Sequence, residues 1–168
     1  INFGPGLNGQ EKHETIPLLT NGFVVRSIKD RKSNPNQLSG NSLNFLKVAG
    51  SDTLDQLSIF EYHGKGKGGP PLHKHAFQDE TFYVLSGTYD FVCDQDRFTL
   101  HAGDMIFLPK DVPHTWAQTT EEGQLLFYFQ PAGKMEQFFN TLGKGKLPEG
   151  YDVFKDHEME VTGPPISY

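Results

Sequence analysis

The chain has 168 residues, which suits one domain with its own hydrophobic core. Its 15 lysines and arginines against 21 aspartates and glutamates give a formal charge of −6, so the sequence argues against nucleic acid and anionic membrane surfaces as partners. No stretch reaches the ~18 consecutive apolar residues that a membrane-spanning helix needs.

The composition favours short strands over long helices. Glycine (18 residues) and proline (11) supply tight turns, and 14 phenylalanines suit the interior of a small barrel. Cys93 is the only cysteine, so an internal disulfide is excluded and a cytoplasmic, reducing compartment is favoured. Because the first residue is Ile1 and not Met, a removed N-terminal signal stays open beside a trimmed start.

The first part of the chain predicts an arm, three strands and a glycine-rich segment. Residues 1–20 show little periodicity and read as an arm. Apolar, β-prone runs predict strands at 22–28, 44–48 and 57–63. Residues 64–71 (GKGKGGPP) fit either a flexible loop at the mouth of a site or a plain surface turn.

The middle of the chain predicts a series of short strands separated by turns. A long strand pair bends at Gly87, and several shorter strands follow. The predicted ranges are 81–93, 97–100, 105–108, 114–118 and 124–130. This even spacing is typical of an all-β barrel or sandwich, and the absence of alternating strands and helices argues against a doubly wound fold.

One helix is predicted, at residues 134–142. Met135, Phe138, Phe139 and Leu142 recur at helical spacing and form one apolar face. We expect this helix to pack on the outside of the barrel or on a partner, with a polar tail extending across the surface from residue 144. The apolar face and the two terminal arms favour a homodimer.

The histidines point to a metal site. His73 and His75 are two residues apart, so in a strand their side chains share one face. Glu80 begins an apolar strand, where a carboxylate is costly unless it is paired or bound to a metal. With His114, these residues offer three imidazoles and one carboxylate, a plausible set for a first-row transition metal.

Two motifs resemble those of the cupin superfamily. The first has the form H-x-H-x4-E-x6-G and spans His73 to Gly87. The second has the form G-x5-P followed by a histidine and spans Gly103 to His114. Asp111 stands where the family has glycine, and Gln118 where it has asparagine. Neither departure affects a predicted ligand.

The resemblance implies an all-β fold, a double-stranded β-helix (jelly-roll or cupin barrel) with one short C-terminal helix. It implies a single domain over residues 1–168, with the barrel at about 40–132, an N-terminal arm and strands at 1–39, and the helix and tail at 133–168. Relatives are often dimeric and bind one divalent metal, commonly iron, manganese, nickel, zinc or copper. The closest likeness is to small single-barrel cupins labelled quercetin dioxygenase-like.

Three classes of function follow. The first is a dioxygenase-like oxidoreductase on a small organic substrate of aromatic or flavonol type, with Glu80 as a metal ligand and candidate general base. Phe82 and Trp116 share faces with the ligands, so they are possible pocket residues. The second is a non-redox enzyme, an isomerase or decarboxylase. The third is a barrel that binds a small ligand without catalysis.

The remaining reactive side chains are assigned structural roles. His63 lies beside the glycine-rich segment and is read mainly as a surface or turn residue. His101 is expected to be exposed, and Cys93 to fill space in the core.

Overall fold

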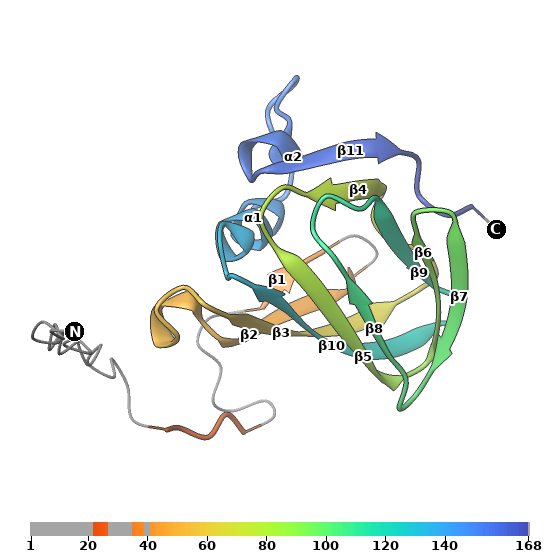
Figure 1. Cartoon of the computed structure of the whole chain (residues 1–168), viewed down its shortest axis with the longest axis horizontal. Helices are drawn as coiled ribbons and strands as arrows, with labels where there is room; N and C mark the ends of the chain where they lie inside the picture. Colours follow the sequence, from red (N-terminus) through yellow and green to blue (C-terminus); the bar gives the residue numbers. More distant parts are fainter. Residues whose placement is uncertain (1–21, 27–34, 39–40, 168) are drawn as a thin grey trace, which may run out of the picture.

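The structure is a computed structural model, which describes residues 22–26, 35–38 and 41–167. Two antiparallel sheets face each other and form a barrel (Figure 1). The strands are β1 Asn36–Gln37, β2 Leu43–Val48, β3 Ser58–Lys65, β4 Leu72–His75, β5 Asp79–Ser86, β6 Thr88–Cys93, β7 Asp96–His101, β8 Met105–Leu108, β9 His114–Gln118, β10 Glu122–Gln130 and β11 Met159–Gly163. The helices are α1 Met135–Leu142 and α2 Val153–Asp156, with a 3₁₀ turn at Gly50–Asp52.

One sheet has the strand order β1-β2-β3-β10-β5-β8, and the other has β11-β4-β9-β6-β7. The all-β jelly-roll prediction is therefore confirmed. Alternation along each strand sends every second side chain inward, as β3 and β10 show most clearly. Aromatic rings from three neighbouring strands fill the interior: Phe127 stacks on Phe60 at 5.4 Å and on Phe82 at 5.2 Å between ring centroids.

Most predicted strands lie where the sequence placed them, and β8 and β9 match to the residue. The strand predicted at 22–28 is wrong where it can be compared, because residues 22–26 form no strand. Strands need a partner backbone, and none of the described strands pairs with this stretch. The predicted arm at 1–20 lies outside the described residues.

The predicted helix is present at nearly the expected residues, but its position relative to the barrel differs from the expected one. α1 lies over one end of the barrel, beside α2 (Figure 1). Its apolar face points into the barrel, where the Phe139 ring lies 4.9 Å from that of Phe60 and Met135 is 1% exposed. This face is therefore buried in its own chain, which removes it as support for a homodimer. None of the described helices has the length and apolar character to cross a membrane.

The C-terminal tail is also more structured than expected. Asp152 caps α2 by accepting hydrogen bonds from the backbone N–H groups of Phe154 and Lys155, each at 3.1 Å. The following strand β11 pairs with β4, with Met159 opposite His75. The described residues thus contain a second short helix and an edge strand where a surface tail was predicted.

The glycine-rich segment is tied to the barrel. Its first two residues, 64 and 65, belong to β3, and the rest forms a loop. Gly68 exchanges two backbone hydrogen bonds with Gln118 on β9, at 3.0 and 2.9 Å. The loop also passes so close to β9 that a Cβ atom added to Gly69 would lie 1.8 Å from the carbonyl oxygen of Trp116.

Replacing Gly69 with alanine should therefore destabilise the fold, because the added methyl group meets a strand carbonyl that cannot move aside. We expect Gly69→Ala to lower the free energy of unfolding by about 1–3 kcal/mol, as overpacking does. Urea denaturation measures this value. Gly22→Ala is the control, since apart from its chain neighbours none of the described residues has an atom within 4 Å of its added Cβ. Equal stability of the two variants would contradict the close approach.

Candidate metal centre

Three strands from the two sheets bring the four predicted ligands together. β4 carries two of them, β9 the third histidine and β5 the carboxylate: His73, His75, His114 and Glu80. His73 lies directly opposite His114 in the β4–β9 pair. All four side chains are buried, and one candidate ligand atom from each lies within 4.8 Å of the others.

The cluster leaves buried nitrogen atoms without hydrogen-bond partners. Nε2 of His114 lies 3.2 Å from Oε2 of Glu80, and Nε2 of His75 lies 3.6 Å from the same oxygen. Yet neither ring nitrogen of His75, nor Nε2 of His114, has a hydrogen bond. Buried polar atoms without partners are costly, and a bound cation would satisfy Nε2 of His114 and one ring nitrogen of His75. The donor set therefore fits a divalent transition metal.

Backbone carbonyl groups orient two of the imidazoles. Nδ1 of His73 donates to the carbonyl oxygen of Pro71 at 2.8 Å, and Nδ1 of His114 donates to that of Val112 at 2.9 Å. In each case the acceptor lies two residues earlier in the chain. With the proton held on Nδ1, the Nε2 lone pair is free to bind a metal, as in many metal sites.

Burial and mutual proximity set the protonation of the cluster. Burial, together with the neighbouring His114 and His75, lowers the pKa of His73 to about 4, so this imidazole is neutral at neutral pH. Burial alone would raise the pKa of Glu80, but the same two imidazoles outweigh it and bring that pKa to about 2. Neutral imidazole and ionised carboxylate are the forms that bind metals.

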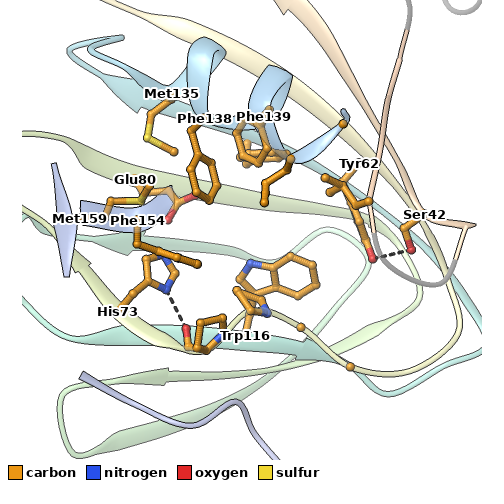
Figure 2. Close-up of a pocket in the computed structure, with 18 of the residues that line it drawn as sticks. Ser42, Tyr62, His73, Glu80, Trp116, Met135, Phe138, Phe139, Phe154 and Met159 are labelled. Atoms are coloured by element: carbon orange, nitrogen blue, oxygen red, sulfur yellow. Dashed lines mark hydrogen bonds between the residues drawn. The ribbon is translucent and has the colours of Figure 1, made fainter. Parts of the chain in front are cut away.

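The cluster opens on a cavity of about 960 Å³. Phe82 and Trp116, the two pocket residues predicted from the sequence, both line it. Figure 2 shows aromatic and sulfur-containing side chains around this space. Several of them come from α1, α2 and β11 and were not predicted: Met135, Phe138, Phe139, Phe154 and Met159. The sequence feature that could have pointed to these residues is the pair of adjacent phenylalanines, Phe138 and Phe139, on the predicted helix.

The other reactive residues lie away from the cluster. His63 is partly buried on β3, where its Nε2 lies 2.5 Å from Oε1 of Glu61, and it does not line the cavity. His101 is exposed on β7, as expected. Cys93 is partly buried, and burial with nearby acidic groups raises the pKa of its thiol, which suits a packing role.

Comparison with known proteins agrees with the fold and the motifs. The sequence model of the cupin domain matches residues 59–129, which contain all four clustered side chains. Residues 59–129 therefore form a cupin domain. The chain is 27% identical over 106 residues to a quercetin 2,3-dioxygenase of Bacillus subtilis, a match that covers 63% of the chain and 31% of that enzyme. It is 28% identical over 112 residues to an uncharacterized protein of Aquifex aeolicus, covering 66% and 88% of the two chains.

Solved structures support the same architecture. An RmlC-like cupin from Shewanella frigidimarina superposes with a TM-score of 0.51 at 23% identity, covering 62% of this chain and 89% of that one. A protein described as a predicted oxalate decarboxylase from Thermotoga maritima gives a TM-score of 0.56 at 21% identity, covering 65% and 99%. At these identities the likeness establishes the barrel and leaves the reaction open. The chain spans less than a third of the Bacillus subtilis enzyme.

Removing one clustered side chain should abolish metal binding. We expect the wild-type protein, loaded with zinc or manganese and desalted, to retain about one ion per chain by elemental analysis, and Glu80→Gln and His114→Ala to retain almost none. The loaded wild-type protein should also melt at a higher temperature than the chelated protein. His101→Ala is the control, because its imidazole is exposed on β7. Equal metal content in all four proteins would place the ion elsewhere.

The low pKa of His73 predicts how the stability of the chelated protein depends on pH. The unfolded chain takes up a proton near the ordinary pKa of 6.5, but the folded chain does so only near 4. The free energy of unfolding should therefore fall as the pH decreases from about 6.5 to about 4. We expect His73→Gln to reduce this dependence in urea titrations at a series of pH values, and His101→Gln to leave it unchanged. Identical slopes in all three proteins would contradict the burial effect.

Proposed function

We propose that this protein is a metal-dependent, dioxygenase-like oxidoreductase that acts on a small aromatic substrate of flavonol type. The observation that carries the proposal is the joining of a four-ligand cluster to an aromatic cavity of about 960 Å³. That volume lies in the range of small-molecule sites, and the lining suits a flat apolar ligand. The identity to a quercetin 2,3-dioxygenase over the barrel supports the same substrate class.

The clustered residues would divide the work of the site. A divalent iron, manganese, nickel, zinc or copper ion, held by the three imidazoles and Glu80, would supply a Lewis acid and, for the redox-active metals, an electron donor or acceptor. The imidazoles of His73 and His114 keep fixed directions through their backbone carbonyl partners. The rings of Phe138, Phe154 and their neighbours exclude water from the reacting substrate.

Glu80 is also the candidate general base. Among the described residues it is the only carboxylate that lines the cavity, and its pKa of about 2 keeps it ionised. Oε2 of Glu80 faces His75 and His114 and would bind the ion, which leaves the other carboxylate oxygen to accept the proton of a substrate hydroxyl group.

Two further functions are kept as alternatives. A non-redox enzyme, such as a decarboxylase or isomerase, would use the same ligands, and an oxalate decarboxylase-like barrel shares the fold. A sugar-phosphate isomerase is less favoured, because the cations that line the cavity, Lys65 and Lys67, are paired with Glu122 and Glu121. A cupin that binds a ligand without turnover is the third candidate. The homodimer and the absence of nucleic-acid partners stay predictions.

Oxygen uptake tests the proposal directly. We expect the protein, reconstituted with iron, manganese, nickel or copper in turn, to consume oxygen with flavonols or catechols and to form a new product detectable by mass spectrometry. Glu80→Gln, which we expect to lose the bound ion together with the carboxylate, should lower the rate at least about 10²-fold. His101→Ala should retain the full rate. Loss or rearrangement of the substrate without oxygen consumption would favour the non-redox enzyme. Binding without any product would favour a protein that binds its ligand without turnover.

A further inference from the structure

Trp116 occupies a fixed position in the cavity wall. It lies on β9, two residues after His114 and on the same face, and it lines the cavity. Its ring meets those of Tyr62, Tyr89 and Phe82 edge to face, at centroid distances of 5.1, 5.9 and 6.1 Å. Three aromatic neighbours therefore hold the indole in one orientation. Figure 2 shows the ring inside the space between the metal ligands and Tyr62.

The indole N–H of Trp116 has no hydrogen-bond acceptor among the described residues, although tryptophan in a protein interior usually has one. The cavity lies in front of it, so the group that satisfies this donor must come from the cavity itself. A buried or half-buried donor without an acceptor weakens binding of any ligand that covers it with apolar atoms.

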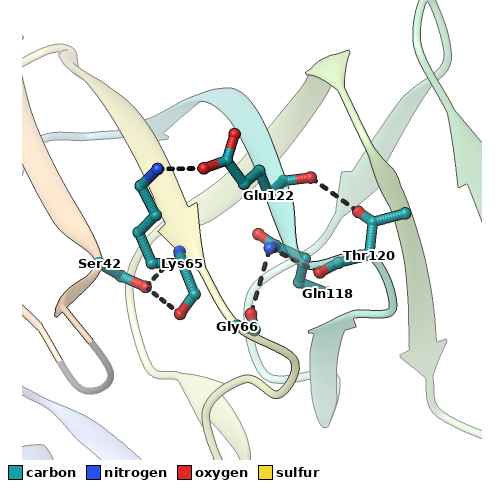
Figure 3. A network of polar contacts seen from close by, with 6 residues as sticks. All are labelled: Ser42, Lys65, Gly66, Gln118, Thr120 and Glu122. Atoms are coloured by element: carbon teal, nitrogen blue, oxygen red, sulfur yellow. Dashed lines mark hydrogen bonds and ion pairs between the residues drawn. The ribbon is translucent and has the colours of Figure 1, made fainter.

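The polar side chains around the aromatic cluster of Trp116 are bonded to other groups. The Tyr62 hydroxyl donates to Oγ of Ser42 at 3.0 Å, and the same Oγ accepts the backbone N–H of Lys65 at 3.0 Å. Gln118, the next inward residue of β9, donates to the carbonyl oxygens of Gly66 and Thr120 at 3.1 and 2.9 Å (Figure 3). Its Oε1 accepts from Tyr89 at 3.2 Å.

Trp116 cannot easily turn away to find another acceptor. Its backbone carbonyl is packed beneath Gly69, and its strand is bonded to the glycine loop through Gln118. The indole N–H is thus a fixed donor presented to the cavity from a mostly apolar wall, and a fixed donor of this kind orients a ligand at little entropic cost.

We propose that Trp116 determines ligand orientation by donating its indole N–H to an oxygen atom of the ligand. This rests on the proposed small-molecule role of the cavity, but not on turnover. It defines the ligand class more closely: a planar aromatic molecule with one oxygen function directed to the clustered ligands and a second, hydrogen-bond-accepting oxygen on the Trp116 side. An aromatic molecule of equal size without the second oxygen binds more weakly.

The chain has a single tryptophan, so its indole N–H gives one cross-peak in a ¹⁵N–¹H correlation spectrum. The zinc-loaded, full-length protein is titrated with 3-hydroxyflavone and, separately, with catechol. A hydrogen bond to oxygen moves the indole proton downfield, whereas stacking of a ring alone moves it upfield. A downfield shift with either probe is the expected result. An upfield shift, or no shift, with both probes overturns the proposal.

A pair of variants gives a second readout. Calorimetry with the probe that shifts the resonance should show binding about tenfold weaker in Trp116→Phe, close to the largest effect of one neutral hydrogen bond. Tyr62→Phe removes one polar atom from the same wall, but that hydroxyl already donates to Ser42, so binding should change less than about twofold. Equal losses in the two variants overturn the proposal. A downfield shift without oxygen uptake would retain this inference and reject the dioxygenase.

Discussion

The register between β4 and β9 is the constraint on which the site depends. It sets His73 opposite His114 across one sheet, and the period of β4 places His75 on the same inner face. Glu80 reaches the cluster from β5 in the other sheet, so the packing of the two sheets completes the ligand set. A slip of one residue in either strand would turn its ligands outward.

The cluster combines groups that would destabilise the barrel if each stood alone. An ionised carboxylate and three imidazoles occupy an interior otherwise filled with aromatic rings, and three of their nitrogen atoms lack hydrogen bonds. Burial, reinforced by the other two imidazoles, keeps His73 neutral, and His75 and His114 keep Glu80 ionised in spite of its burial. The interior is therefore preorganised for a cation, and part of the stability of the loaded protein must come from the bound ion.

Local rules predicted that the four side chains meet, because spacing within one strand determines which side chains share a face. For this reason the shared face of His73 and His75 could be predicted from the sequence. The turns before β8 and β9 could be predicted as well, because turns also depend on local residue types. Contacts between segments that are distant in the sequence could not be predicted in this way. The sequence does not specify which surface the face of α1 covers, so Phe138 and Phe139 were placed outside the barrel and not in the cavity.

The same limit applies to the tail and the N-terminal region. β11 is a short strand of mixed apolar and polar residues with only Met159 buried, and it is a strand because β4 offers it an edge. Conversely, residues 22–26 have the composition of a strand, but no described strand pairs with them. In both cases the deciding information is whether one of the described strands pairs with the segment, which composition does not record.

The pairing of β11 with β4 connects the candidate metal centre to the C-terminal part of the chain. Without β11, the strand that carries His73 and His75 would be the edge of its sheet, with one row of backbone groups unpaired. Docking of the tail therefore helps to order the strand that carries these two histidines. A bound ion would slow amide exchange in residues 159–163, and a cut in the exposed stretch between the two helices would loosen the ion.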